Sequence, residues 1–303
     1  MIGRNSIKLV VFILAGAAMA GVILSRHPSS IEPTVLASIP RDFVVFDATL
    51  YKDKPSLVPY HIRPITLLYE SRLFVANQLP TAMPPQTIVR TIAYELRSSK
   101  EPVALDIERW PIKGDEVTVQ STVRKFLLVL SWVEHEAPRV AFGVYGTVPV
   151  PDYWRAIRDP ASAEFQSWQQ DNDRLERIND KVDALFPSIY TFYPDRQGWV
   201  TYAIAQIAEA RRKAKGKPVY TFLWPQYHDS NVLLSHQPLD PDYWDLQLHT
   251  VAQHADGAVI WGGWGENGPE SWNEAAPWWQ VTKRFMRQLD QTAPGVPKDP
   301  SVE

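Results

Sequence analysis

The chain contains 303 residues and carries a formal net charge of −3 at pH 7. It lacks cysteine, which excludes disulfides, thiol nucleophiles and cysteine-bound metals, and its mildly acidic balance provides no broad basic surface for nucleic acid. The length suits one large α/β domain or two small ones. The 12 Trp and 12 Tyr residues indicate either a large aromatic core or stacking platforms for sugar rings.

The N-terminus carries a targeting pattern. Arg4 and Lys8 precede an apolar run over residues 9–24, which contains the small-residue cleavage pattern Ala18-Met19-Ala20. Residues 1–26 are therefore predicted to be a secretory signal peptide, with a short uncleaved membrane anchor as the alternative. Cleavage after Ala20 would remove two cations and shift the formal charge from −3 to −5. We expect an exported protein that is periplasmic, secreted or anchored to the outer face of the membrane.

Residues 27–41 are rich in Pro and Ser and predict a linker, and residues 293–303 predict a flexible tail. Between them, residues 42–292 show no internal repeat and predict one domain, in which short apolar segments alternate with helical patterns. The predicted strands are Phe43–Phe46, Ile65–Tyr69, Val103–Ile107, Val140–Tyr145, Leu185–Tyr190, Pro218–Leu223 and Ala258–Trp261. The predicted helices are Pro85–Arg97, Val117–Glu134, Ala161–Leu185, Val200–Arg212, Pro241–Gln253 and Trp272–Leu289.

Alternation of strands and helices predicts an α/β fold with a parallel sheet. Seven strands, most of them followed by a helix, fit a TIM-like barrel. A doubly wound sheet would require a Gly-rich first turn, and none follows Phe46. In a TIM-like barrel the chemistry takes place at the C-terminal ends of the strands, so the residues that end each strand are the candidates for a site.

The third predicted strand ends in two carboxylates. By alternation, Val103, Leu105 and Ile107 share an apolar face, while Asp106 and Glu108 share the opposite face with the small Ala104. Burying two carboxylates costs several kcal/mol each unless they are paired. The segment by itself fits a salt-bridged or helix-capping acid pair as well as a catalytic pair.

Aromatic residues collect at the ends of the other strands. Sugar rings have apolar faces that stack on Trp and Tyr, and their hydroxyl groups bind carboxylates and phenols, so the pattern is typical of a glycosidase cleft. Asp47, which ends the first strand, either reaches this cleft or caps the following turn. The candidate strand-end residues are Tyr145, Ser188, Tyr190, Trp224, Tyr227, Trp261, Trp264, Glu266 and Asn267.

Four segments together resemble the hyaluronidase family of glycoside hydrolases (family fifty-six). The stretch from Ala104 to Pro111 is similar to that family's Asp-aromatic-Glu strand with Trp110 soon after it, and Phe142–Tyr145 is similar to its Trp-Gly-Phe-Tyr strand. Residues 184–190 resemble its Ala-Leu-Tyr-Pro-Ser-Ile-Tyr segment, and residues 257–261 its Gly-Val-Val-Leu-Trp segment. The matches occur in the family's order over about residues 43–290. The family's fold is a distorted (β/α)7 barrel.

The resemblance implies a retaining mechanism in which the acetamido group of an N-acetylhexosamine acts as the nucleophile. Glu108 would be the general acid and base, and Asp106 would orient the acetamido group. Tyr145 and Tyr190 would donate hydrogen bonds to it, and Trp261 would form the floor under the reacting sugar. The other predicted substrate contacts are Trp110, Trp224, Tyr227, Trp264, Glu266, Asn267 and Asp47.

Some features depart from the family or leave the function open. The family's disulfides are missing, and the acidic domain leaves the identity of the polysaccharide or oligosaccharide substrate undecided. A barrel that binds glycan without catalysis is one alternative. A glycosidase for non-acetylated sugars is another, with Glu266 as its second carboxylate.

No cofactor is predicted, and no metal site, because the histidines show no ligand spacing and Asp171-Asn172-Asp173 lacks the Gly and Glu of a calcium loop.

Overall fold

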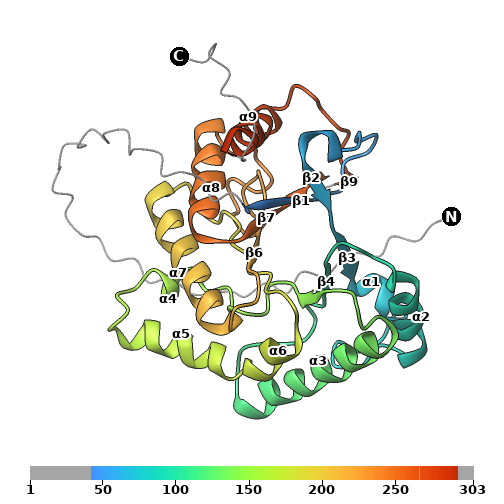
Figure 1. The fold of residues 1–303 in the computed structure, drawn as a ribbon. Coiled ribbons are helices and arrows are strands. Elements are labelled where there is room, and N and C mark those ends of the chain that lie inside the picture. The colour runs from blue at the N-terminus through green and yellow to red at the C-terminus, as the bar shows by residue number, and fades with distance from the viewer. Residues whose placement is uncertain (1–41, 266, 293–303) are drawn as a thin grey trace. The chain divides into compact units, whose positions relative to one another are not determined.

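The computed structural model describes residues 42–265 and 267–292 as strands surrounded by helices (Figure 1). The predicted signal peptide or anchor, the linker over 27–41, the tail over 293–303 and Glu266 lie outside the described residues. Within the described ranges, no helix combines the length and the apolar character that a membrane span requires.

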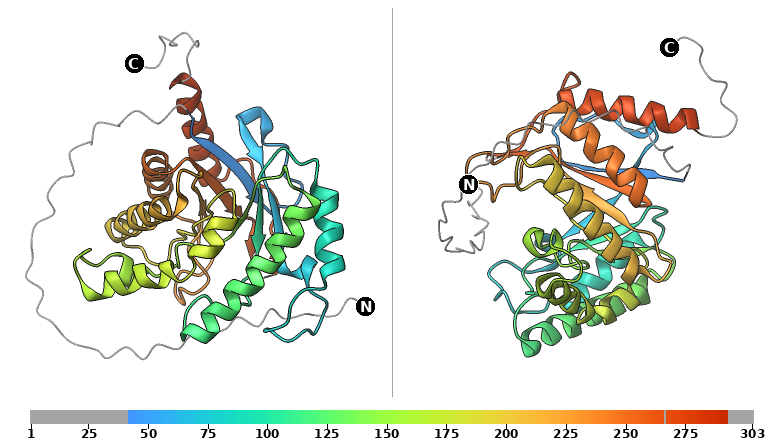
Figure 2. Two further views of the ribbon diagram at one scale, coloured as in Figure 1. Left: turned by 60° about the horizontal axis from the view of Figure 1, so that its bottom comes forward. Right: turned by 90° about the vertical axis from the view of Figure 1, so that its left-hand side faces the viewer.

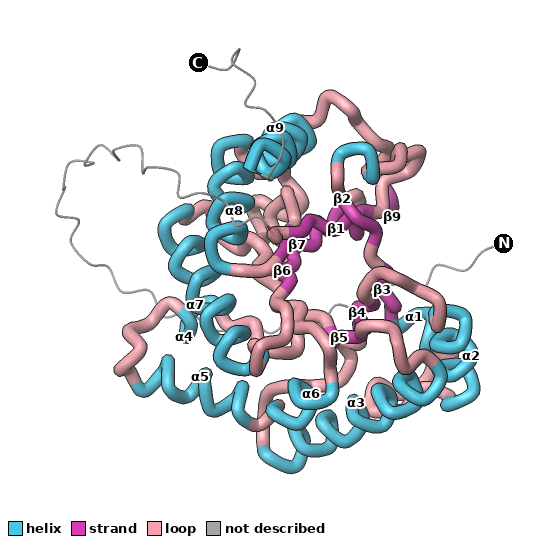
Figure 3. The backbone as a smooth tube through the Cα atoms, viewed as in Figure 1, coloured by secondary structure: helices cyan, strands magenta, loops and turns pink. Residues whose placement is uncertain are grey.

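The strands form two parallel sheets. One has the order β2 (Ile62–Pro64), β1 (Val44–Thr49), β7 (Gly257–Gly262), β6 (Tyr220–Leu223), and the other has the order β3 (Thr66–Tyr69), β4 (Val103–Asp106), β5 (Phe142–Val144). Figure 3 shows these strands in the interior, with the helices around them. A short antiparallel hairpin, β8 (Trp264–Gly265) and β9 (Gly268–Pro269), follows β7. The α/β prediction with parallel strands is confirmed.

The two sheets adjoin in two places. Only Ile65 separates β2 from β3, so the chain passes directly from one sheet into the other, and β2 is a strand that the sequence analysis missed. At the second place, isolated parallel bridges link Tyr145 to Phe186 and Leu185 to Val219. The predicted strand Leu185–Tyr190 is thus a series of single bridges and not a continuous ladder. Pro187 has no N–H to donate to a neighbouring strand, which explains the interruption.

Gly143 permits the close approach of residues 184–186 to β5. A Cβ atom at this position would lie 2.4 Å from the carbonyl oxygen of Ala184 and 2.5 Å from the ring of Phe186. A larger residue would therefore push the bridged segment away from β5. The glycine in the motif Phe142–Tyr145 has a structural role that the sequence analysis did not assign.

Helices cover the outer faces of both sheets, as the views in Figure 2 show. Their bounds are η1 (Val58–Tyr60), α1 (Glu70–Leu73), α2 (Gln86–Leu96), α3 (Glu116–Glu136), α4 (Tyr153–Ala156), α5 (Ala163–Asp173), α6 (Glu176–Lys181), α7 (Arg196–Ala214), α8 (Pro241–His254) and α9 (Pro277–Thr292). Asp115 and Asp195 cap α3 and α7 by accepting hydrogen bonds from backbone N–H groups of the first turn.

The predicted helix Ala161–Leu185 was wrong in its continuity. The structure breaks it at Arg174 and Leu175 and forms α5 and α6, and the chain becomes extended at Val182. Asn172 holds the end of α5, because its side chain accepts a hydrogen bond from the Val150 N–H at 2.8 Å and donates one to Glu209 at 3.0 Å. The break then turns the chain so that Leu175 is fully buried.

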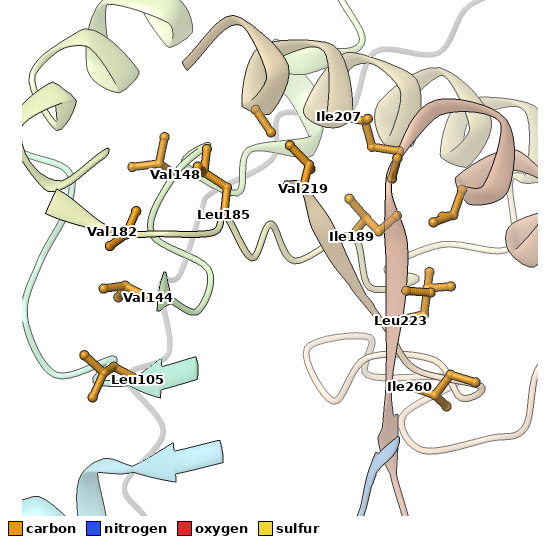
Figure 4. Packing of buried hydrophobic residues seen from close by; sticks show 14 of the residues in the cluster. Leu105, Val144, Val148, Val182, Leu185, Ile189, Ile207, Val219, Leu223 and Ile260 are labelled. Carbon is orange, nitrogen blue, oxygen red and sulfur yellow. The ribbon is translucent and has the colours of Figure 1, made fainter. Parts of the chain in front are cut away.

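The core has two parts, which are separated by the strands. The larger part lies between the strands and the helices and includes Leu105, Val144, Leu185, Val219, Leu223 and Ile260 (Figure 4). The smaller part lies on the inner faces of the strands and consists of Phe46, Ala48, Ala104, Ala184, Phe186, Tyr190, Phe222, Trp224 and Val259. On β4, Val103 and Leu105 face the helices while Ala104 faces inward, so the predicted alternation of this strand is confirmed.

Substitution of Phe126 on α3 tests how much the outer part of the core contributes to stability. Its ring is fully buried and makes an edge contact with Trp110 at a centroid distance of 5.0 Å. We expect Phe126→Ala to lower the free energy of unfolding by about 3–5 kcal/mol, because it leaves a cavity. Leu128→Ala is the control on the same helix, because Leu128 is 45% exposed, and it should change the free energy by less than about 0.5 kcal/mol. Equal losses in urea unfolding would contradict this description of α3.

Candidate active site

The acid pair lies at the C-terminal end of β4. Asp106 is the last residue of this strand and pairs across the sheet with Tyr69, the last residue of β3. The side chains of Asp106 and Glu108 share a hydrogen bond. Glu108 is exposed at the strand end, whereas Asp106 is half-buried. By alternation from Ala104, Asp106 faces the inner side, as predicted from the sequence, and Glu108 lies two residues beyond the end of the strand.

Burial and neighbouring acids raise the pKa of both carboxyl groups. Burial, followed by the charges of Glu108 and Glu70, raises the pKa of Asp106 to about 8. Burial and the charge of Glu70 also raise the pKa of Glu108, although its tip contacts solvent, because protein surrounds it on most sides. Two hydrogen-bonded carboxyl groups titrate as one system. The pair therefore retains one proton near neutral pH.

Among the described residues, no salt bridge neutralises this pair. Arg109 instead pairs with Glu70, with 3.3 Å between Nη2 and Oε1, and the backbone N–H of Arg109 donates to Glu70 Oε2 at 3.2 Å. The guanidinium carbon of Arg109 also lies 3.8 Å from the centroid of the Phe74 ring. The helix-capping alternative fails as well, since Asp115 caps α3. Neither structural explanation of the two carboxylates that the sequence left open applies.

Two tyrosines lie beside the acids, as predicted. Tyr145 donates a hydrogen bond to Ser188 Oγ at 3.2 Å, and its ring centroid is 6.2 Å from that of Tyr190. Burial raises the pKa of both phenols well above the usual value, and the charges of Asp106 and Glu108 raise it further. Both hydroxyl groups therefore stay protonated and can donate hydrogen bonds.

Aromatic rings form a wall next to Tyr190. Its ring lies 5.6 Å from Trp224 and 6.0 Å from Trp261, and these two tryptophans are 4.7 Å apart in an edge contact. Trp261 Nε1 donates to the Tyr69 hydroxyl at 3.0 Å, which orients the indole. Burial raises the pKa of Tyr69 to about 12, and the charge of Asp106 adds to the effect.

Tyr69, Glu70 and His228 are site residues that the sequence analysis missed. Tyr69 ends a predicted strand, so the strand-end rule that selected Tyr145 could have selected it. Glu70 follows Tyr69 in the chain and contributes to the raised pKa values of both acids. Nothing in the local sequence around His228 indicates its position.

A cavity of about 300 Å³ opens beside Glu108. Its walls combine this acid with phenol and hydroxyl groups and with apolar surface, which is the usual composition of a site for a small molecule. The lining residues are Ile107, Glu108, Trp110, Ile112, Tyr145, Gly146, Thr147, Pro151, Ser188, Phe192 and His228. Within residues 42–265 and 267–292, no group of three His, Asp or Glu residues could hold a metal ion.

Two predicted substrate contacts have other partners. Asp47 lies on the outer face of β1, opposite to Phe46 and Ala48, and its carboxylate accepts hydrogen bonds from Thr49 and Lys54. The turn-capping alternative therefore describes it better. Trp110 is only 2% exposed, and its Nε1 donates to the carbonyl of Ala82. It supports the cavity wall from the core and does not present an open ring face.

The remaining predicted contacts are not among the residues that line the cavity. Trp224 is buried, and its Nε1 donates to Gln226 Oε1 at 2.6 Å. Tyr227 is half-buried and forms an isolated parallel β-bridge with Thr191. Trp264 is 39% exposed on β8, and Asn267 is exposed in the turn that follows. Glu266 lies outside the described residues, so the second carboxylate of a conventional glycosidase pair stays a prediction.

The fold is similar to that of bee venom hyaluronidase. One crystal structure of that protein matches with a TM-score of 0.55 and 17% identity, over 82% of this chain and 97% of that chain. A second, in complex with a hyaluronic acid tetramer, matches with a TM-score of 0.52 and 16% identity, over 82% of this chain and 96% of that chain. At such identities the likeness concerns the fold alone. No protein-family model matches the sequence, and neither does any curated protein.

Proposed function

We propose that this chain is a retaining glycoside hydrolase that cleaves a polysaccharide at N-acetylhexosamine residues, with the substrate's acetamido group as the nucleophile. The observation that carries the proposal is the hydrogen-bonded acid pair Asp106 and Glu108, which holds one proton beside an open cavity and two tyrosine donors. We also infer that the two sheets, joined at Ile65 and bridged through residues 185–188, constitute a distorted (β/α)7 barrel.

The separation of the acids supports one of the two kinds of retaining mechanism over the other. A conventional acid and nucleophile pair places its carboxyl groups about 5–5.5 Å apart, on opposite sides of the sugar bond. The side chains of Asp106, the last residue of β4, and Glu108, two residues beyond it, are in hydrogen-bond contact. A sugar ring cannot lie between them. This favours a nucleophile that comes from the substrate, and an acetamido oxygen next to the anomeric carbon has the right position.

The position of the shared proton supports different catalytic roles for Asp106 and Glu108. In the free site Asp106 is the deeper group and has a pKa of about 8. An acetamido N–H that donates to Asp106 would stabilise its ionised form and lower its pKa. The proton would then move to Glu108, whose tip reaches the cavity. Substrate binding would in this way prepare Glu108 as the general acid for the leaving oxygen and Asp106 as the stabiliser of the positive intermediate.

The two phenols and the aromatic wall support the same assignment. Tyr145 and Tyr190 stay protonated and can donate to the acetamido oxygen and to sugar hydroxyl groups. Trp261, oriented by Tyr69, provides an apolar ring next to Tyr190. We extend the proposal to an exported protein, because Arg4, Lys8 and the apolar run over 9–24 have the pattern of a signal peptide.

Product analysis of a glycan panel tests the proposal. We expect the purified protein to release products that end in N-acetylhexosamine from at least one of hyaluronan, chondroitin, chitin oligomers or bacterial exopolysaccharide. The new reducing end should retain its anomeric configuration in early time points of an NMR assay. Inversion would contradict the acetamido mechanism. Binding without turnover across the panel would favour a barrel that binds glycan without catalysis.

A further inference from the structure

Two exposed aromatic side chains meet on the edge of the domain that carries the site. Trp154 on α4 is 54% exposed and Tyr193 is 37% exposed, and their ring centroids are 5.3 Å apart. Trp154 lies on the first helix after β5, and Tyr193 follows the bridged segment 185–190, so both belong to segments that follow the C-terminal ends of strands. Tyr153, which is 8% exposed, contacts both rings at 5.2 and 5.1 Å and supports them from below.

A continuous row of aromatic rings joins this pair to the acid site. The row starts at Tyr190, continues to His228 at 6.0 Å and reaches Phe192 after a further 4.9 Å. From Phe192 it continues to Tyr193 at 6.5 Å and then to Trp154. His228 and Phe192 line the cavity beside Glu108, as does Pro151 three positions before Trp154. The exposed rings thus extend the cavity and are not an isolated patch.

The charges that flank Trp154 in the chain, those of Asp152 and Arg155, are already paired. Asp152 accepts from Arg155 Nε at 2.8 Å and pairs with Lys113 at 3.4 Å, and Arg155 also pairs with Asp171 at 2.7 Å. Burial lowers the pKa of His228, so its ring is neutral at pH 7. A ligand at this surface would be held by ring stacking and not by attraction between charges. The apolar face of a sugar ring has the matching chemistry.

We propose that Trp154 and Tyr193 form a distal subsite. A further sugar of the bound polymer stacks there, several sugar rings away from the acid pair. The inference rests on the proposed function, because it assigns the same polymer to the cavity and to the exposed rings. It goes further in requiring that affinity grows with chain length and that the enzyme acts on chains long enough to reach the subsite.

Binding of oligosaccharides of different length tests directly whether affinity depends on the distal subsite. In the Glu108→Gln background, which prevents cleavage, calorimetry would compare the disaccharide with the octasaccharide of both chitin and hyaluronan. Trp154→Ala should weaken octasaccharide binding by about tenfold, which corresponds to roughly 1.4 kcal/mol, and leave disaccharide binding unchanged. Tyr193→Ala should act in the same direction, and Trp154→Phe should restore most of the affinity. Tyr94→Ala is the matched control, because Tyr94 is an aromatic residue with 53% exposure on α2.

The outcomes separate the subsite from the function. Melting temperatures within about 2 °C of the parent for the exposed variants would attribute a loss of affinity to the missing ring and support the subsite. Octasaccharide affinity that is unchanged by both Trp154→Ala and Tyr193→Ala would overturn the subsite and leave the proposed function intact. A parent protein that binds neither oligosaccharide series and no other glycan of the panel would overturn both.

Discussion

Glu108→Gln is expected to abolish glycan hydrolysis while leaving glycan binding in place. The amide keeps the size of the side chain but cannot deliver a proton to the leaving oxygen. General acid catalysis contributes about 10²- to 10⁴-fold, so kcat should fall by at least that factor. Initial rates on the polymer that the panel identifies, together with a dissociation constant for an oligomer of it, measure both quantities.

A control on α2 makes this result specific. Glu95 is exposed on the outer helical layer, and Glu95→Gln should leave kcat and binding unchanged. Turnover in Glu108→Gln close to that of the parent would reject the assignment of the general acid. A loss of oligomer binding equal to the loss of rate would instead indicate that the variant disturbs the cavity, which Tyr145 and Ser188 share with Glu108.

Asp106→Asn is expected to remove most of the activity and at the same time to stabilise the protein at alkaline pH. The amide cannot stabilise a positive intermediate, and loss of one such electrostatic contact costs about 10²- to 10³-fold in rate. Burial and the nearby acids raise the pKa of Asp106 to about 8 in the folded protein, against about 3.9 in an unfolded chain. The folded state therefore binds more protons than the unfolded state between these two values.

The sign of the stability change follows from this difference. In the parent, the contribution of protonated Asp106 is fully present below about pH 4 and is lost as the pH rises through about 8. Asn does not titrate, so the variant avoids this loss. The difference in melting temperature, variant minus parent, should grow from pH 4 to pH 9, with each kcal/mol worth about 2–4 °C. A difference that shrinks over this range, or an unchanged kcat, would contradict the description of the pair.

Local sequence was sufficient to predict the arrangement of β4. Alternation depends only on strand geometry, and the structure places Val103, Leu105 and Ile107 in the outer part of the core and Ala104 in the inner part, as predicted. The helices over Gln86–Leu96 and Glu116–Glu136 were predicted to within a few residues, because their apolar positions recur with helical spacing. The continuous helix over 161–185 was wrong because Asn172 makes its decisive contacts with Val150 and Glu209, which are distant in the chain.

The amino-acid order specified most of the strands and the aromatic residues at their ends, since each depends on neighbours in the chain. Only the tertiary structure decided how Asp106 and Glu108 behave. Arg109, adjacent to Glu108, pairs with Glu70 from 39 positions earlier, so the acid pair keeps a shared proton and has no neutralising cation within residues 42–265 and 267–292. The contact between Trp154 on α4 and Tyr193 also joins two segments that are distant in the chain. Pairing, burial and pKa depend on which distant groups the fold brings together, and no local pattern contains that information.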